Sequence, residues 1–397
     1  MLREYKEKGF DIDEIYDESQ SEESQRANLN KYTVNGILNY FEQKQNALHR
    51  KFSTNLTAEE YQAGFDFDTT KEQMKVNPLM GDSFQSEYLN SIFRGMMGFI
   101  IRCGQSGSGK TTLSVGDICK VAVKEYWDSD LNKWVMNKSR AGNALFINTE
   151  MDLRTELDPK FIAWIADVPM HKILDGEYTQ EEEDRLDRAS EILTDSGIYI
   201  VDDPEFTTKS LTSTIAYYAE EKNVKNVCFD YIANNGWVAK ELSSETKVPQ
   251  REDMVLLTIT DRLKQASRKY HVNILSGTQL NGSERENELI DERCLAGGKS
   301  QVRKTDGTMI ILEPKAKELE MIKPMLDRNG ILTPDKTPNM VTHIIKGRAS
   351  KYPKHIKVYQ YVDLGTGRVK DLFCTTQMNE KIIIEKTIVQ NKDWDIF

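Results

Sequence analysis

A glycine-rich stretch around residue 105 constrains the fold of this chain more than any other feature. Residues 102–112 read Arg-Cys-Gly-Gln-Ser-Gly-Ser-Gly-Lys-Thr-Thr and fit the pattern G-x-x-x-x-G-K-[ST], in which glycines let backbone N–H groups curl around a phosphate. Lys110 is expected to neutralise the β- and γ-phosphates, and the hydroxyl of Thr111 to face Mg²⁺. The residues expected to bind the nucleotide are Gly104, Gln105, Ser106, Gly107, Ser108, Gly109, Lys110, Thr111 and Thr112.

The segments on either side of the loop support this interpretation. Phe99-Ile100-Ile101 is typical of a short buried strand, and Leu113, Ile118 and Val121 have the spacing of an apolar helix face. The helix would point the positive end of its dipole at the phosphates. A glycine-rich turn that carries Lys-Thr by chance is the alternative. We therefore expect ATP or another nucleoside triphosphate, with Mg²⁺, as the ligand.

Composition narrows the class of protein. Hydrophobic residues make up 39% of the 397 residues and charged residues 29%, as in soluble globular proteins. No apolar run approaches the ~18 residues of a membrane span and the start is unlike a signal peptide, so we expect a cytoplasmic protein without a membrane partner. The five cysteines form no C-x-x-C pair, which favours reduced thiols. Because the net charge is −10, nucleic acid would need a local basic surface.

The chain is predicted to have four parts. Residues 1–30 are acidic and poor in apolar side chains, as in a partly disordered tail. Residues 31–77 read as a small helical arm or linker, which could pack on its own domain or on a neighbouring subunit. Residues 78–375 form the nucleotide-binding domain, and residues 376–397 a C-terminal tail.

Strands and helices alternate after the phosphate loop, which predicts an α/β fold with a mainly parallel sheet. Thr179 and Glu182 make a capping box that opens one of the helices. We interpret residues 233–251 as a polar loop and residues 314–339 as a charged insertion. The strands are expected at 144–147, 198–201, 227–230, 274–279, 308–313, 341–346, 355–362 and 368–373, and other helices at 153–167, through Tyr217 and at 252–270.

Polar residues follow three of these strands, where open α/β sheets bind their ligands. Asp230 ends an apolar run and is expected in the Mg²⁺ shell; an ordinary turn aspartate is the alternative. Glu150 could orient the attacking water and take its proton, or could simply begin a helix. Gln279 is the third such residue.

Several short segments resemble the ATPase domain of DnaB-type replicative helicases, in superfamily 4, over about residues 79–373. They are Asn148-Thr149-Glu150-Met151, Ile200-Val201-Asp202-Asp203-Pro204, Asp230-Tyr231, Ser276-Gly277-Thr278-Gln279-Leu280-Asn281 and Ile344-Ile345-Lys346-Gly347-Arg348. The resemblance implies a RecA-like core and a homo-oligomeric ring, expected to be a hexamer, that hydrolyses NTP between subunits and pulls single-stranded DNA through its centre.

The same resemblance assigns roles to individual residues. It implies that Glu150 is the catalytic base, that Gln279 senses the γ-phosphate and couples it to the DNA loops, and that Lys346 and Arg348 reach into the neighbour's site. A solvated strand end is the simpler interpretation of Lys346 and Arg348.

The segment from Arg293 to Lys304 is the candidate DNA-binding loop. Its basic residues surround Gly297-Gly298, and it has no acidic residue, a composition suited to binding the DNA backbone. The family's Arg-Glu-Ser-Gly element is replaced here by Leu295-Ala296-Gly297-Gly298-Lys299-Ser300, so only the location carries over. A flexible surface loop is the alternative. The candidate DNA-binding residues are Arg293, Lys299, Arg303 and Lys304.

The N-terminal end of the chain departs from the family pattern, and the C-terminal end carries a candidate docking segment. Residues 1–77 are too short and polar for the helical domain that recruits primase, which makes a primase partner doubtful and is similar to phage-encoded relatives. Residues 391–397, Asn-Lys-Asp-Trp-Asp-Ile-Phe, suit a docking peptide for a replisome partner, or fold back onto the domain.

The sequence therefore predicts a replicative DNA helicase. Two alternatives are a RecA- or KaiC-like ATPase that acts without unwinding, and a ring-forming loader or regulatory subunit that binds nucleotide but barely hydrolyses it. Glu150 and Arg348 argue against the last of these.

Overall fold

The computed structural model describes residues 64, 67–76, 78–285, 289–328 and 337–390. The chain divides into two compact units, Met1–Pro78 and Leu79–Phe397. In the first unit the described part includes helix α4 (Phe67–Val76). The predicted acidic tail, the helix expected from residue 31 and the predicted docking peptide at 391–397 lie outside the described residues.

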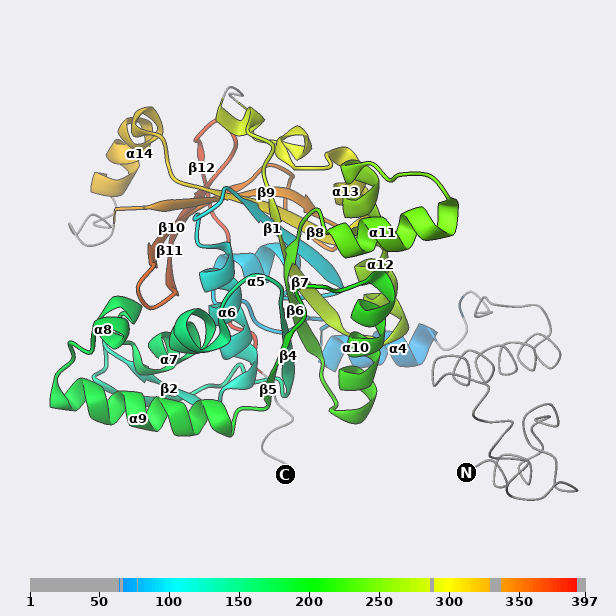
Figure 1. The fold of residues 1–397 in the computed structure, drawn as a ribbon. Helices are drawn as coiled ribbons and strands as arrows, with labels where there is room; N and C mark the ends of the chain where they lie inside the picture. The colour runs from blue at the N-terminus through cyan, green and yellow to red at the C-terminus, as the bar shows by residue number, and fades with distance from the viewer. Residues whose placement is uncertain (1–63, 65–66, 77, 286–288, 329–336, 391–397) are drawn as a thin grey trace, which may run out of the picture. The chain divides into compact units, whose positions relative to one another are not determined.

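The second unit is built on one ten-stranded sheet with the order β12-β11-β10-β9-β8-β1-β7-β6-β4-β5 (Figure 1). From β8 to β5 all neighbouring strands are parallel. From β8 outward to β12 they are antiparallel. This confirms the predicted α/β fold with a mainly parallel sheet. The strands are β1 (Phe99–Gly104), β4 (Ala144–Asn148), β5 (Ile198–Asp202), β6 (Asn226–Ile232), β7 (Asn273–Gln279), β8 (Gly307–Leu312), β9 (Met340–Gly347), β10 (Lys357–Asp363), β11 (Arg368–Thr375) and β12 (Lys381–Ile382).

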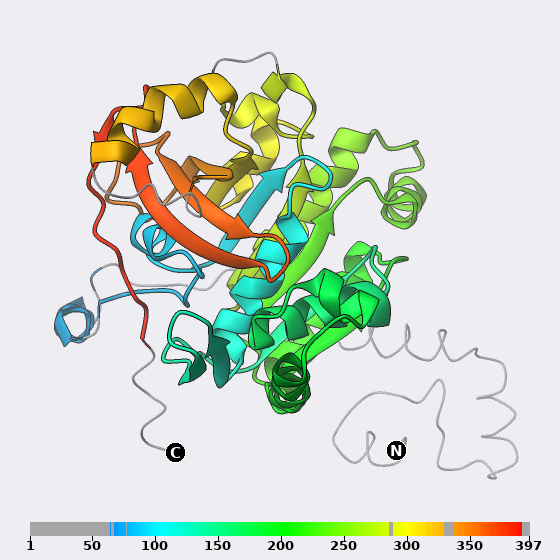
Figure 2. The same cartoon turned by 90° about the vertical axis from the view of Figure 1, so that its left-hand side faces the viewer.

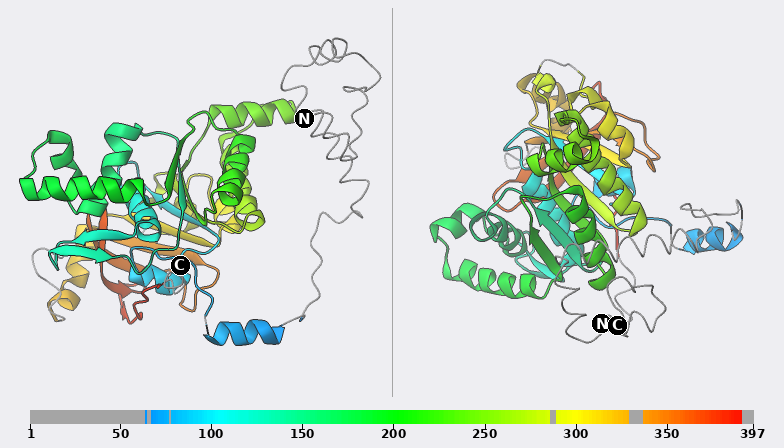
Figure 3. Two further views of the ribbon diagram at one scale, coloured as in Figure 1. Left: turned by 90° about the horizontal axis from the view of Figure 1, so that it is seen from below. Right: turned by 45° about the vertical axis from the view of Figure 1, so that its right-hand side comes forward.

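Helices cover both faces of the parallel half, which explains the nearly continuous apolar strands (Figures 1 and 3). On one face α6 (Lys110–Ala122) and α7 (Asp158–Ala166) cover the sheet, and α9 (Gln180–Thr194) packs against α7. On the other, α10 (Thr208–Glu221) and α12 (Glu252–Lys269) pack over Leu145. The capping box of Thr179 and Glu182 begins α9 as predicted.

The predicted polar loop and the charged insertion both contain helices. Within 233–251, α11 (Gly236–Thr246) begins where the side chain of Asn235 accepts hydrogen bonds from two backbone N–H groups. Within 314–339, α14 (Ala316–Arg328) buries Ile322 against the antiparallel strands, above the β10–β11 hairpin in Figure 2. The fully buried apolar side chain described in each helix is Val238 in α11 and Ile322 in α14, so neither segment has a broad apolar face that periodicity would indicate.

Other elements were not expected from the sequence. They are helices α5 (Glu87–Phe93) and α8 (Met170–Asp175), the hairpin of β2 (Glu125–Asp128) and β3 (Lys133–Met136), and α13 (Lys299–Lys304) inside the predicted DNA loop. The fold also continues beyond residue 375, because β12 pairs with β11 and Ile384 is buried in the core. Among the described residues, no helix is both long and apolar enough to cross a membrane.

Candidate functional site

The phosphate loop joins β1 to α6 at the carboxyl edge of the parallel strands. Gly107 and Gly109 have φ of +74° and +84°, a conformation that favours glycine. The Nζ of Lys110 donates to the carbonyl oxygens of Gly104 (3.1 Å) and Gln105 (2.7 Å). Burial lowers the pKa of Lys110, and the charges of Asp230, Cys103 and Glu150 partly offset this effect. The loop therefore holds a buried cation at its centre, as a phosphate site requires.

Strand β6 brings Asp230 against the start of α6. The hydroxyl of Thr111 donates to Oδ2 of Asp230 at 2.6 Å, and Asp230 is only 4% exposed. Burial raises the pKa of this carboxyl, while the Thr111 hydrogen bond and the charge of Lys110 lower it. Mg²⁺ in phosphate sites uses one or two protein oxygens, with water and phosphate for the rest. This hydroxyl and carboxylate fit such a site.

The two other strand-end residues lie at the same edge. Asn148 at the end of β4 pairs with Asp230 on β6. Glu150 is exposed two residues after Asn148, and its charge raises the pKa of Asp230. Gln279 at the end of β7 pairs with Gly104. Its Nε2 donates to the hydroxyl of Tyr231 at 3.0 Å. The structure thus brings Lys110, Thr111, Glu150, Asp230 and Gln279 together.

Glu284 is part of this site although the sequence did not indicate it. Its side chain is 3% exposed and its Oε1 accepts from Nε2 of Gln105 at 2.8 Å. Its Oε2 is buried and has no hydrogen-bond partner among the described residues. A cavity of about 230 Å³ lies between the phosphate loop, Glu284 and the end of β8. Glu284 therefore joins the segment after Gln279 to the phosphate loop.

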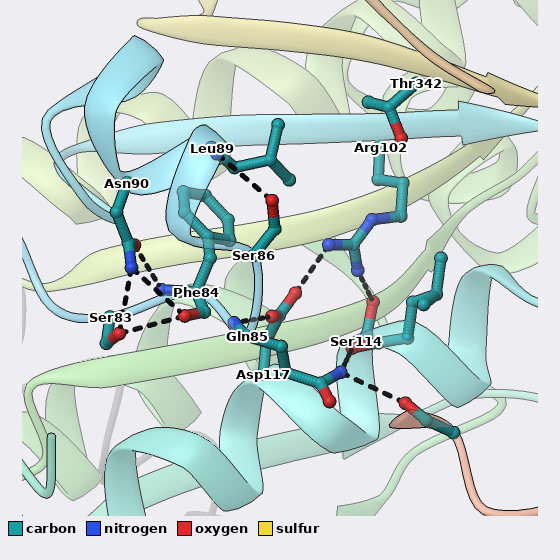
Figure 4. Close-up of polar contacts among 12 residues, drawn as sticks. Ser83, Phe84, Gln85, Ser86, Leu89, Asn90, Arg102, Ser114, Asp117 and Thr342 are labelled. Atoms are coloured by element: carbon teal, nitrogen blue, oxygen red, sulfur yellow. Dashed lines mark hydrogen bonds and ion pairs between the residues drawn. The ribbon is translucent and has the colours of Figure 1, made fainter. Parts of the chain in front are cut away.

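A buried ion pair joins the strand and the helix on either side of the phosphate loop (Figure 4). Arg102 on β1 and Asp117 on α6 are 3% and 2% exposed and pair through NH2 and Oδ2. Arg102 also donates to Ser114 at 3.1 Å, and Asp117 accepts from the backbone N–H of Gln85 at 2.8 Å. The only signal in the sequence was a charged residue inside an apolar strand. The pair ties together the strand and helix that flank the loop.

Lys346 and Arg348 lie at the opposite end of the sheet. Gly347 pairs with Gly307, and Gly307 pairs with Ile100, four residues before Gly104 on β1. At ~3.3 Å per residue along the strands, Gly347 is ~13 Å from the level of the phosphate loop of its own chain, and Lys346 is one residue nearer. The structure does not bring Lys346 and Arg348 to the candidate nucleotide-binding residues of their own chain.

Contacts within the subunit engage both of these side chains. The Nζ of Lys346 donates to the carbonyl oxygens of Val302 (2.7 Å) and Arg303 (3.1 Å) at the end of α13. Burial, and then the charge of Arg348, lower the pKa of Lys346. Arg348 forms an ion pair with Asp306 at 3.1 Å.

The basic residues of 293–304 are close to acidic residues from outside that segment. Arg293 pairs with Asp291 at 2.7 Å, and Lys304 pairs with Asp261 at 2.6 Å. Lys299 lies 3.9 Å from Glu292. The segment has no acidic residue of its own, but the fold brings acidic side chains from outside it close to three of its four candidate residues. Arg303 is exposed on α13.

The sequence and the fold are similar to those of known proteins. The family described as DnaB-like helicase C terminal domain matches residues 84–293, just over half of the 397 residues. The chain belongs to the DnaB-like helicase family. A relative in Bacillus subtilis (strain 168), the SPbeta prophage-derived uncharacterized protein YorI, is 35% identical over 396 residues, covering 97% of this chain and 77% of the relative. The predicted resemblance is confirmed.

Two solved structures have the same fold. One of them, an ATPase domain, superposes with a TM-score of 0.58 at 14% identity, covering 78% of this chain and 99% of that chain. The other, a DnaB-like replicative helicase studied with its interactions with primase, gives a TM-score of 0.56 at 14% identity and covers 86% of this chain and 73% of that chain. The RecA-like core expected for a DnaB-like helicase is therefore confirmed.

Proposed function

We propose that this chain is the motor of a replicative DNA helicase, which assembles into a ring, hydrolyses ATP or another NTP between subunits and moves along single-stranded DNA to unwind duplex. Membership of the family supports the class of activity. The observation that carries the proposal is the contact of Thr111 with Asp230 beside the buried Lys110. It combines the cation and the oxygen ligands that phosphoryl transfer needs.

The phosphate loop would bind the nucleotide through its backbone N–H groups and Lys110. Thr111 and Asp230 would hold Mg²⁺, which when bound supplies positive charge to the phosphate oxygens. The carbonyl oxygens of Gly104 and Gln105 keep the ammonium of Lys110 at the loop. Phosphoryl transfer depends mainly on positioning and charge. Lys110, Thr111 and Asp230 would therefore not need to rearrange before the reaction.

Glu150 and Gln279 would act on the γ-phosphate side. Glu150 is exposed at the end of β4, where its carboxylate could orient water and accept the proton. Gln279, held by Tyr231, would respond to the γ-phosphate. Glu284 follows in the same segment and contacts Gln105, so movement at the nucleotide would reach residues 280–304.

Arg348 would complete the site of the neighbouring subunit. Its position at the far end of β9 prevents it from reaching the phosphate loop of its own chain. An arginine supplied in trans contributes roughly 10³ to 10⁵ in rate in other NTPases. Hydrolysis would therefore depend on assembly of the ring, for which a hexamer is our expectation from the family.

DNA would pass by α13 and the loop before it. Lys299 and Arg303 are exposed there, and lysine and arginine bind phosphates without reading bases. Because the relative in Bacillus subtilis is prophage-derived, we further propose that the chain is phage-encoded and acts in the cytoplasm of a bacterial host. One solved relative interacts with primase; we assign no such partner to this chain.

A forked-DNA unwinding assay with ATP, beside native mass measurement of the assembly, tests the proposal. The chain should unwind the fork as a ring, and Lys110→Ala should abolish hydrolysis and unwinding while leaving the melting temperature unchanged. Turnover that survives Lys110→Ala in a folded protein would reject the nucleotide site. A well-assembled ring that hydrolyses ATP and never separates strands would reject the helicase.

The ion pairs on the basic segment favour a second candidate. Because Arg293 and Lys304 are paired with Asp291 and Asp261, part of the positive charge expected to attract DNA is already neutralised. A RecA- or KaiC-like ATPase that acts on DNA or protein without unwinding needs less of this charge. It predicts ATP hydrolysis that DNA does not stimulate, measured in the same assay.

A further inference from the structure

Among the residues that the structure describes, Asp306 is the one that holds Arg348 in its own subunit. Its guanidinium lies 3.1 Å from Oδ1 of Asp306, and its backbone N–H donates to the carbonyl oxygen of Asp306 at 2.8 Å. The side chain of Arg348 is 61% exposed and that of Asp306 only 18%. A mostly buried carboxylate thus presents the guanidinium at the surface.

The carboxylate of Asp306 is itself fixed from two other elements. Its Oδ2 accepts from the backbone N–H of Phe99 at 2.9 Å, at the start of β1, and from Nζ of Lys264 on α12. A Cβ at Gly98 would lie 2.3 Å from Oδ2, so glycine at that position gives the carboxylate its room. Strand β1, helix α12 and the end of β9 therefore meet at one side chain.

This arrangement suits a guanidinium that acts outside its own subunit. An unconstrained arginine loses rotamer freedom when it is ordered, and a misplacement of about 1 Å can cost about a hundredfold in rate. Arginine carries five N–H donors, so pairing with Asp306 leaves others for phosphate oxygens. A cavity of about 240 Å³ has both Arg348 and Asp306 in its wall, so packing does not close that side.

Lys346 differs from Arg348 in this respect. Its ammonium donates to two carbonyl oxygens at the end of α13, and it is therefore engaged with the helix that carries the candidate DNA-binding residues. Asp306 follows α13 by two residues. A shift of α13 would change the position of the Asp306 carboxylate directly through the chain.

We infer that Asp306 is a positioning residue, which orients Arg348 toward the phosphates bound by the neighbouring subunit. The inference rests on the proposed function, because it requires a neighbour with a nucleotide. It adds a residue that does not touch the nucleotide and acts only through Arg348.

Rings assembled from two kinds of subunit test this role, because Asp306→Asn can be placed in one kind or in the other. Lys110→Ala subunits have a defective phosphate loop and an intact Arg348, whereas Arg348→Ala subunits have the reverse, so mixing them should restore ATPase activity at mixed interfaces. Adding Asp306→Asn to the Lys110→Ala subunit should lower the restored activity by about tenfold to a hundredfold. Adding it to the Arg348→Ala subunit should leave that activity within about twofold.

This difference between placements separates positioning from a general structural role. Equal losses in the two placements, or no loss in either, overturn the inference. If the parent variants restore nothing, the trans role of Arg348 fails, and the inference with it, before residue 306 is changed. Asp195→Asn, an exposed aspartate that pairs with Lys124, is the matched control and should have no effect in either placement.

Melting temperature and ring assembly are measured for each variant. Should Asp306→Asn fail to assemble, Asp306→Glu keeps the charge and moves the carboxylate by one methylene. It is placed in the same two subunits, with the same expected difference and the same contradicting results.

Discussion

The carboxylate of Asp230 is almost completely buried, and burial raises its pKa above the ordinary value of 3.8. Because the folded-state pKa is the higher one, the ionised form favours unfolding. The contribution of the Asp230 carboxyl to the free energy of unfolding is therefore greatest below pH 3.8. It decreases as the pH rises through the folded-state pKa. At neutral pH without a cation, the residue proposed to hold Mg²⁺ costs stability.

Asp230→Asn should separate this cost from function. The amide oxygen can still accept the Thr111 hydrogen bond but carries no charge, so the melting temperature in magnesium-free buffer should rise by roughly 1 to 3 °C. ATP hydrolysis should be lost. Calorimetry with chelator and an ATPase assay measure the two effects; a lower melting temperature would mean that Lys110 and Thr111 more than offset the burial of the charge.

At the scale of elements, the Arg102–Asp117 pair joins β1 to α6 across the phosphate loop. Arg102→Met should lower the free energy of unfolding by about 3 to 5 kcal/mol, because it leaves Asp117 buried and unpaired. The double variant Arg102→Met with Asp117→Asn should recover at least half of that loss, since Asn can still accept from the backbone N–H of Gln85. Urea unfolding gives both values.

A surface pair provides the control for this prediction. Lys124 and Asp195 lie 3.4 Å apart, with side chains 42% and 67% exposed, and Lys124→Met should change the free energy of unfolding by less than ~1 kcal/mol. A double variant as unstable as Arg102→Met alone would contradict the view that the unpaired charge is the cause.

Helix α13 is the element proposed to face DNA. Replacing Lys299 and Arg303 together with glutamine should weaken binding of every single-stranded sequence, and should lower the slope of log affinity against log salt by about one per lost contact. Fluorescence anisotropy at several salt concentrations measures the slope. Lys209→Gln is the control. Lys209 on α10 is 78% exposed and forms an exposed ion pair with Glu245, as Lys299 does with Glu292. An unchanged slope would place the DNA elsewhere.

The elements that sequence could predict are those whose signal is local. The strand before the phosphate loop and the capping box of Thr179 each depend on residues within one segment. Helix α14 was missed because it is mostly polar. Its buried Ile322 packs against strands β9, β10 and β11, which follow later in the chain. The partners of Arg102, Glu284 and Lys346 were missed for the same reason: each pairing is made by the tertiary fold.

Across the whole second unit, residues 381–384 belong to the fold through β12 and Ile384, and residues 391–397 are the proposed docking peptide. Deleting 391–397 should leave ATPase activity and melting temperature unchanged while abolishing recruitment of a partner. Deleting 383–397 should in addition cost ~2 kcal/mol or more of stability, because Ile384 is buried in the core. Thermal melts of the two truncations decide this; a large loss from the shorter deletion would show that the last residues stabilise the domain.

The segment around Thr387 lies against the first helix of the same unit. Its backbone N–H donates to Glu87 at 3.2 Å and its hydroxyl lies 2.7 Å from that of Ser91, and Met80 and Thr387 line one cavity. The first helix of the second unit and its last described segment are thus neighbours in space. A short linker from Gln390 to Leu79 should close the unit into a permuted chain, whose new termini could be opened at the β2–β3 turn without disturbing the phosphate loop.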